Sequence, residues 1–159
     1  MAYKIIPFVG FDKVKFGIKM DELIKIMGNP SEIEKDNRFS EEDDDTADIV
    51  FYDEIGFSAM FEKVAEGRLS EMDFEGEDFV LEDQVKIGMD KDEVLKILEQ
   101  KGYDEPTQED LEDELEEGDT TEAYTYDEKN ITLWFTEGKL DTIQLSPEMF
   151  DADTIKWPE

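Results

Sequence analysis

The stretch VKFGIKMDELIKIM, residues 14–27, returns 71 positions later as VKIGMDKDEVLKIL, residues 85–98. Both copies place a glycine before a pair of acidic residues, and an apolar run follows. The identical pairs are Val14 and Val85, Lys15 and Lys86, Gly17 and Gly88, Asp21 and Asp92, Glu22 and Glu93, Lys25 and Lys96, and Ile26 and Ile97. So many matches in the same order indicate an internal repeat.

The repeat extends over most of the chain. The same displacement matches EGRLSEMDF (66–74) with EGKLDTIQL (137–145). A displacement of 74 matches FYDEIGFSAMF (51–61) with TYDEKNITLWF (125–135). We therefore expect two units, residues 1–78 and residues 79–159, packed together as one two-lobed domain.

Each unit begins with the pattern of a short helix, over residues 19–28 and 90–101. Acidic residues in the first turn suit the positive end of a helix dipole, and Gly28 and Gly102 are typical of helix ends. Apolar residues recur at helical spacing, which predicts one buried stripe on each helix. These residues are Leu23, Ile26 and Met27 in the first helix, and Val94, Ile97 and Leu98 in the second.

An acidic run and then three strand-like segments follow each helix. The segments are 48–53, 55–61 and 68–74 in the first unit, and 122–127, 130–136 and 139–145 in the second. Their short joins are rich in Gly, Asn and Asp, as in β-hairpins. We predict an α+β fold in which each unit is a short helix, or helix-loop-helix, followed by an antiparallel meander. The two tandem repeats would form one extended antiparallel sheet with the helices on one face.

The charge of the chain restricts its ligands. Its 46 Asp and Glu residues against 16 Lys and Arg residues give a formal net charge of −30. Nucleic acid and anionic membranes are poor ligands for such a chain, because phosphate binding depends on basic side chains. A basic protein is the partner that this charge favours.

The chain contains neither cysteine nor histidine. This excludes disulfides, thiolate chemistry, imidazole catalysis and zinc sites built from those residues. The first residues, MAYKIIPFVGFDKVKFG, lack the apolar core and cleavage site of a signal peptide. We expect a cytoplasmic protein without a membrane span or cofactor, acting as a monomer or weak dimer.

The phrase VKIGMDKDEVLKIL, the downstream proline, a tyrosine-bearing strand pair and LWFTEGKLDTI (133–143) together resemble a known repeat. It is the repeat of the β-lactamase inhibitory protein fold and of the small outer-membrane lipoproteins of the barrel-assembly machinery, the SmpA/OmlA kind. The resemblance implies helices packed on an antiparallel sheet. In the inhibitor, two units in tandem grip another protein with a concave sheet surface. No lactamase-binding residue is carried over, since the resemblance lies in the scaffold.

Acidic runs at matched places in the two units, residues 40–48 and 109–122, are the first candidate binding elements. They could flank one surface and accelerate the association of a basic protein. The alternative is that they are solvated loops. A third possibility is calcium, but neither run places its carboxylates and glycine as an EF-hand loop requires. The candidate residues are Asp43, Asp44, Asp45, Asp48, Glu112, Glu116 and Glu117.

The sheet surface that does not face the core is the second candidate. Alternation in NITLWF (130–135) places Trp134 on the face opposite Leu133, and Met60 takes the equivalent position in the first unit. Large anchors surrounded by polar groups are typical of a protein-binding surface. The alternative is that Trp134 packs on the C-terminal IKWPE or on a nearby loop. The predicted surface residues are Trp134, Met60, Ser58, Thr132, Glu71, Asp73, Thr142 and Gln144.

We predict a non-enzymatic, acidic, protein-binding module that inhibits or neutralises a basic toxin or enzyme. A bacterial immunity protein that blocks a toxin such as a nuclease is its most concrete form. A hydrolase with a carboxylate pair is the enzymatic alternative, but a chain so rich in Asp and Glu offers such pairs everywhere. An assembly protein of the cell envelope, related to the lipoproteins above, is the other alternative.

Overall fold

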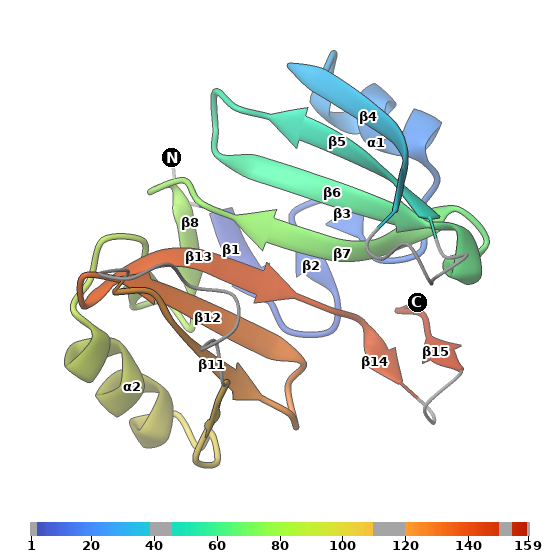
Figure 1. Cartoon of the computed structure of the whole chain (residues 1–159). Helices are drawn as coiled ribbons and strands as arrows, with labels where there is room; N and C mark the ends of the chain where they lie inside the picture. Colours follow the sequence, from blue (N-terminus) through green and yellow to red (C-terminus); the bar gives the residue numbers. More distant parts are fainter. Residues whose placement is uncertain (1–2, 39–45, 110–119, 150–153, 159) are drawn as a thin grey trace.

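The computed structural model describes residues 3–38, 46–109, 120–149 and 154–158. The fold is α+β and mostly antiparallel, with two α-helices in the described part of the chain (Figure 1). The first half contains β1 (Tyr3–Ile6), β2 (Gly10–Phe11), β3 (Val14–Lys15), α1 (Met20–Met27), β4 (Glu32–Arg38), β5 (Thr46–Tyr52), β6 (Phe57–Glu62), a 3-10 turn (Lys63–Ala65) and β7 (Arg68–Phe74). The second contains β8 (Phe79–Leu81), β9 (Val85–Lys86), α2 (Lys91–Gln100), β10 (Thr107–Gln108), β11 (Glu122–Tyr126), β12 (Ile131–Thr136), β13 (Lys139–Leu145), β14 (Glu148–Met149) and β15 (Ile155–Lys156).

The largest sheet has eight strands in the order β10-β11-β12-β13-β7-β6-β5-β4. The halves of the chain meet where β13 pairs antiparallel with β7, which places Gln144 opposite Asp73. Both helices and all six predicted strands are present, with ends within two residues of those expected. The sheet also contains β4 and β10, where the sequence had predicted only connections.

A smaller five-stranded sheet, β3-β2-β1-β8-β9, was not predicted either. Its centre is a parallel pairing of β1 with β8, which joins the start of the chain to the start of the second half. Phe79 of β8 stacks against Tyr3 of β1 at 5.3 Å between ring centroids. The small sheet thus contributes aromatic side chains to the core and ties together segments far apart in the sequence.

The two halves share several local features at equivalent positions. Leu69 and Leu140 each exchange backbone hydrogen bonds with the segment before the nearby helix: Gly17 donates to Leu69 and Gly88 to Leu140. The pairing of β6 with β7 shifts register after Met60, and that of β12 with β13 shifts after Trp134. Both shifts are β-bulges, which bend a strand and increase its twist.

One hydrophobic cluster occupies the inner face of the large sheet. Alternate residues of β6, β7, β12 and β13 are buried there, including Phe57, Phe74, Leu133 and Ile143. Leu23 of α1, and Val94 and Leu98 of α2, join this cluster. The expected burial of Ile26 was wrong, because its side chain is 40% exposed. Helix α1 has only eight residues, and Leu23 is the one that it buries.

No helix among the described residues combines the length and apolar character needed to cross a bilayer.

Candidate protein-binding face

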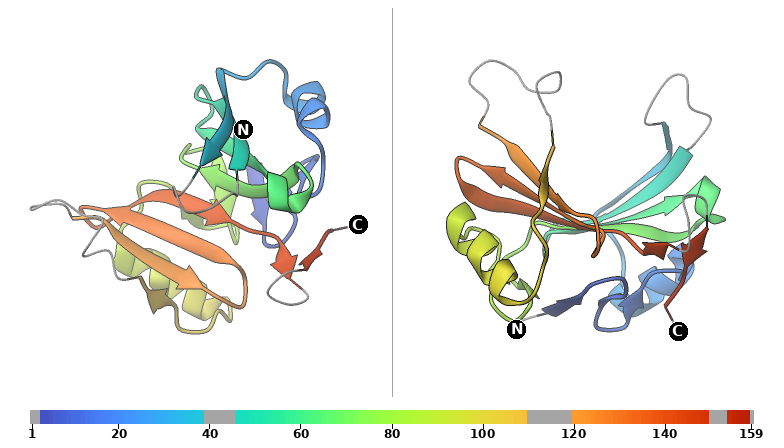
Figure 2. Two further views of the ribbon diagram at one scale, coloured as in Figure 1. Left: turned by 45° about the vertical axis from the view of Figure 1, so that its right-hand side comes forward. Right: turned by 90° about the horizontal axis from the view of Figure 1, so that it is seen from below.

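The surface of the large sheet opposite the core is here called the open face. It consists of Ile49, Phe51, Ser58, Met60, Glu71, Asp73, Thr132, Trp134, Thr142 and Gln144, all partly exposed. In the right-hand view of Figure 2, both ends of the large sheet rise on the same side of its centre, away from the small sheet that contains β1. The open face is therefore concave.

Strand register places the predicted surface residues on this one face, since directly opposed residues of neighbouring antiparallel strands point the same way. A single row crosses the sheet through opposed pairs. Its members are Phe51, Ser58, Asp73, Gln144, Thr132 and Thr125. Met60 stands beside this row, opposite Glu71 and Ile49. The structure thus brings together all eight residues predicted for the sheet surface.

Trp134 is held by a chain of hydrogen bonds that crosses the junction between the two halves. Its Nε1 donates to Oε1 of Gln144 at 3.0 Å. Nε2 of the same Gln144 donates to Oε1 of Glu71 at 2.8 Å. The indole, the amide and the carboxylate are thereby fixed relative to one another, so this part of the open face is preorganised. The tryptophan that packs against the first half is Trp157, whose ring lies 4.6 Å from the Arg68 guanidinium.

The two carboxyl groups at the centre of the open face are in unusual electrostatic surroundings. Burial, together with the nearby charges of Glu71 and Glu75, raises the pKa of Asp73 to about 8. Burial also raises the pKa of Glu71, against the hydrogen bond from Gln144, which lowers it. Oδ1 of Asp73 is buried and receives no hydrogen bond within the structure as described.

Apolar side chains border this acidic centre on the side of β5. Ile49 lies opposite Met60, and Phe51 lies opposite Ser58. The sequence alone does not decide which side of this strand faces the core, because Val50 and Tyr52 share one parity and Phe51 alternates with them. The register decides it, since Tyr52 pairs with the buried Phe57. The open face therefore has a larger apolar margin than Met60 and Trp134 alone provide.

Asp48 does not belong to the open face. It lies opposite Phe61, whose side chain is buried, so Asp48 points to the inner side of the sheet near its edge. The six other predicted acidic residues lie outside the described residues. They are Asp43, Asp44, Asp45, Glu112, Glu116 and Glu117. The calcium alternative depends on the same runs and falls largely outside the described part of the chain as well.

Within the described ranges there is no group of three or more carboxylates placed to hold a metal ion. What the open face offers is a rigid, acidic concavity with aromatic and thioether anchors. Such a surface can bind a cationic group and bury apolar area beside it. Comparison of the chain with protein-family models, with curated proteins and with solved structures found no match.

Proposed function

We propose that this protein is a non-enzymatic, acidic binding module whose open face grips a basic protein and inhibits or neutralises it. The observation that carries the proposal is the hydrogen-bonded series Trp134, Gln144 and Glu71, which fixes an aromatic anchor beside an acidic centre. Buried aromatic anchors dominate the affinity of many protein interfaces. Preorganisation reduces the entropy lost when such an anchor is covered.

The net charge supports a basic partner. A chain with a formal charge of −30 attracts positively charged proteins over several ångströms and repels acidic ones. The acidic runs 40–48 and 109–122 add to this attraction wherever their side chains lie. We propose that long-range charge sets the association rate, and that the open face supplies the short-range affinity.

The most concrete form of this function is a cytoplasmic bacterial immunity protein that covers the active site of a toxin. A nuclease fits this role, because its substrate-binding surface is positively charged in order to bind phosphates. Inhibition would follow from occupation of that surface by the acidic concavity. The resemblance to the β-lactamase inhibitory protein fold, which also grips an enzyme with a sheet, supports this form of the proposal.

We further propose that residues 1–78 and 79–159 are two copies of one unit with their helices on the same face of the sheet. The matched bulges after Met60 and Trp134 support this, as do the matched backbone bonds of Leu69 and Leu140. Figure 2 draws α1 and α2 on the same side of the large sheet in its right-hand view. Duplication explains how one concave face acquires two unlike anchors at equivalent positions.

The direct test is a pull-down from a bacterial lysate at low and at high ionic strength, with the purified chain as bait. We expect a basic protein to be retained at low ionic strength and released as salt screens the charges. Reversal of Asp43, Asp44 and Asp45 to lysine should weaken retention. Capture of no basic protein, or of one that is indifferent to both salt and charge reversal, would sink the proposal.

A further inference from the structure

The centre of the open face contains an acidic group without a counter-charge. Asp73 lies opposite Ser58 on one side and Gln144 on the other, and neither residue is charged. Glu71, two residues earlier on β7, lies opposite Met60. Arg68 of the same strand is engaged elsewhere, because its Nε donates to the carbonyl of Gly17 at 2.7 Å.

The two carboxyl groups differ in how they are satisfied. Glu71 receives a hydrogen bond from Gln144. Oδ1 of Asp73 is buried and has no donor among the residues that the structure describes. A buried carboxyl oxygen without a donor costs free energy, and a proton or an external cation relieves this cost. The charges of Glu71 and Glu75 raise the pKa of Asp73, and the charge of Glu62 raises the pKa of Glu71. All are acidic, so the position disfavours a free carboxylate.

We propose that the partner inserts one lysine or arginine side chain between Asp73 and Glu71, and that this cation displaces a proton held by Asp73 in the free protein. The inference rests on the proposed function and specifies the chemistry of its central contact. The aliphatic part of the incoming side chain lies along Met60, as long basic side chains commonly lie on apolar surface. The proton passes to solvent, so charge is conserved in the exchange.

This exchange couples binding to pH. Burial and the neighbouring carboxylates raise the pKa of Asp73 to about 8, so free Asp73 is mainly protonated at pH 7. Because the bound state holds Asp73 as a carboxylate, binding strengthens as pH rises and then levels off above the pKa of free Asp73. Well below the pKa of free Asp73, the dissociation constant should rise about tenfold for each unit by which the pH falls. At neutral pH, binding should release nearly one proton.

The experiment is isothermal titration calorimetry of the full chain with a decalysine peptide at neutral pH, in two buffers that differ in ionisation enthalpy. The dependence of the observed heat on the buffer gives the number of protons released. We expect release of nearly one proton for the natural sequence. Asp73→Asn should abolish most of this release and flatten the dependence of the dissociation constant on pH.

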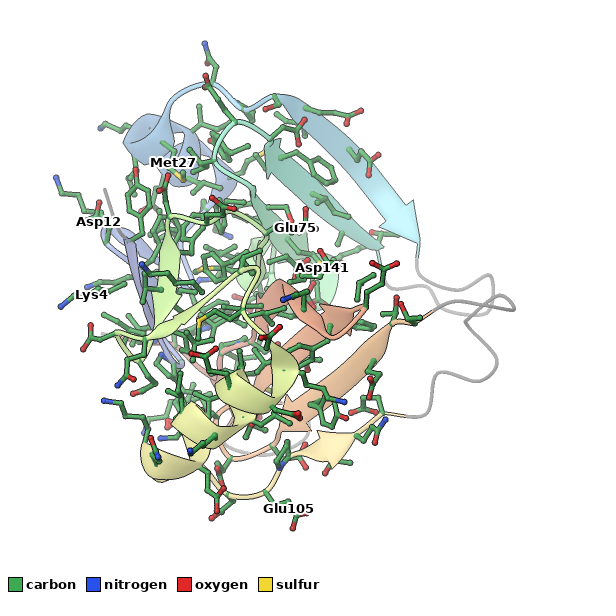
Figure 3. The ribbon with its side chains drawn as sticks, turned by 90° about the vertical axis from the view of Figure 1, so that its left-hand side faces the viewer. Lys4, Asp12, Met27, Glu75, Glu105 and Asp141 are labelled. Carbon is green, nitrogen blue, oxygen red and sulfur yellow. The ribbon has the colours of Figure 1, made fainter. Side chains whose placement is uncertain are left out.

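Asp12→Asn is the matched control, since it makes the same change of charge away from the open face. Asp12 lies in an exposed turn at φ 50°, a conformation that asparagine adopts readily. Figure 3 places Asp12 near Lys4 at the left edge of the view, away from Asp141 of β13. The control should release as many protons as the natural sequence does.

The outcomes separate the two proposals. If decalysine binds without releasing a proton, or if Asp73→Asn leaves the release unchanged, the proposal that a cation binds at Asp73 is wrong. The proposed function would still stand, and the pull-down would test it separately. Failure of decalysine to bind even at low ionic strength overturns both, because the open face would then lack the attraction for basic chains on which both depend. Loss of proton release in Asp73→Asn but not in Asp12→Asn supports the inference.

Discussion

Asp73 and Glu71 are two positions apart on β7, yet their side chains are in different states. Gln144 donates to Glu71, whereas one oxygen of Asp73 is buried with no donor in the described part of the chain. Groups of this kind are seldom kept for stability, since a buried unpaired carboxyl costs free energy. This cost is in line with the proposed role of Asp73, in which a cation of the partner pairs with it.

Asp73 should therefore destabilise the free protein at neutral pH. An unfolded aspartate loses its proton near pH 4, whereas folded Asp73 keeps it to about pH 8. Between these values the unfolded state binds fewer protons, so rising pH lowers the free energy of unfolding. We expect Asp73→Asn to raise the free energy of unfolding at pH 7 by about 1 to 3 kcal/mol, a figure reduced because the side chain is partly exposed.

Urea unfolding at several pH values measures this effect. The gain from Asp73→Asn should shrink as pH falls and approach zero at about pH 3, where aspartate is mostly protonated in both states. Asp12→Asn should change the free energy of unfolding by less than about 0.5 kcal/mol throughout. A gain that is the same at every pH would show that the carboxylate is not the cause.

Gln144 is predicted to organise the open face. Gln144→Ala removes the acceptor of the Trp134 indole and the donor to Glu71, so we expect the free energy of unfolding to fall by about 1 to 2 kcal/mol. The fluorescence of Trp134 should also change, since its Nε1 loses its partner. Gln84→Ala, in an exposed turn, is the control and should leave both quantities nearly unchanged. Equal effects of the two substitutions would contradict an organising role.

At the scale of elements, the paired hairpins β6–β7 and β12–β13 build the open face. Each carries a bulge at the same place, and each presents its anchor, Met60 or Trp134, immediately before the bulge. A bulge bends its strand and increases the local twist. Two bulges in equivalent hairpins therefore help a joined sheet to curve into a concavity.

Equivalent residues of the two hairpins should contribute equally to stability. Leu69 and Leu140 are both almost fully buried and both bonded to the segment before a helix. Leu69→Ala and Leu140→Ala should each lower the free energy of unfolding by about 2 to 5 kcal/mol. Denaturant unfolding of both variants checks this. A difference between them larger than about 2 kcal/mol would contradict the equivalence of the two units.

Helical spacing of apolar residues was enough to predict the two helices, and turn composition with a mostly alternating pattern was enough to predict the strands of the two hairpins. Strand β4 was missed because EIEKDNR contains a single apolar residue, Ile33, and its pairing with β5 depends on backbone bonds rather than on pattern. The sequence did not show which side of β5 faces the core, because large apolar residues occupy both sets of alternating positions: Ile49 and Phe51 on one side, Val50 and Tyr52 on the other. The parallel pairing of β1 with β8 joins segments far apart in the chain, which local signals do not report.

For the site, alternation predicted which residues share the open face but not how they interact. The chain from Trp134 through Gln144 to Glu71 depends on β13 lying beside β7, and no sequence pattern specified that junction. The raised pKa of Asp73 depends on the same packing. Asp48 was assigned with the acidic run that precedes it, but the register of β5 points it to the inner side of the sheet.

At the scale of the whole molecule, the strong negative charge and the concave sheet have complementary roles in the proposed binding of a basic protein. The charge of −30 acts at long range and is screened by salt, whereas the open face acts only on contact. Association rate and dissociation rate should therefore respond to different changes. Removal of distant acidic residues should slow association, and removal of Trp134 or Met60 should speed dissociation.

The measurement that tests the central claim most directly is the affinity of the captured basic partner for Trp134→Ala, compared with Trp157→Ala. Both variants lose one indole, but Trp134 lies on the open face and Trp157 packs against Arg68. With both variants shown to be folded by circular dichroism, Trp134→Ala should weaken binding by at least about 30-fold, the effect of an interface hot spot of about 2 kcal/mol. Trp157→Ala should leave the affinity nearly unchanged. Unchanged affinity in Trp134→Ala would contradict the claim that the open face is the binding surface.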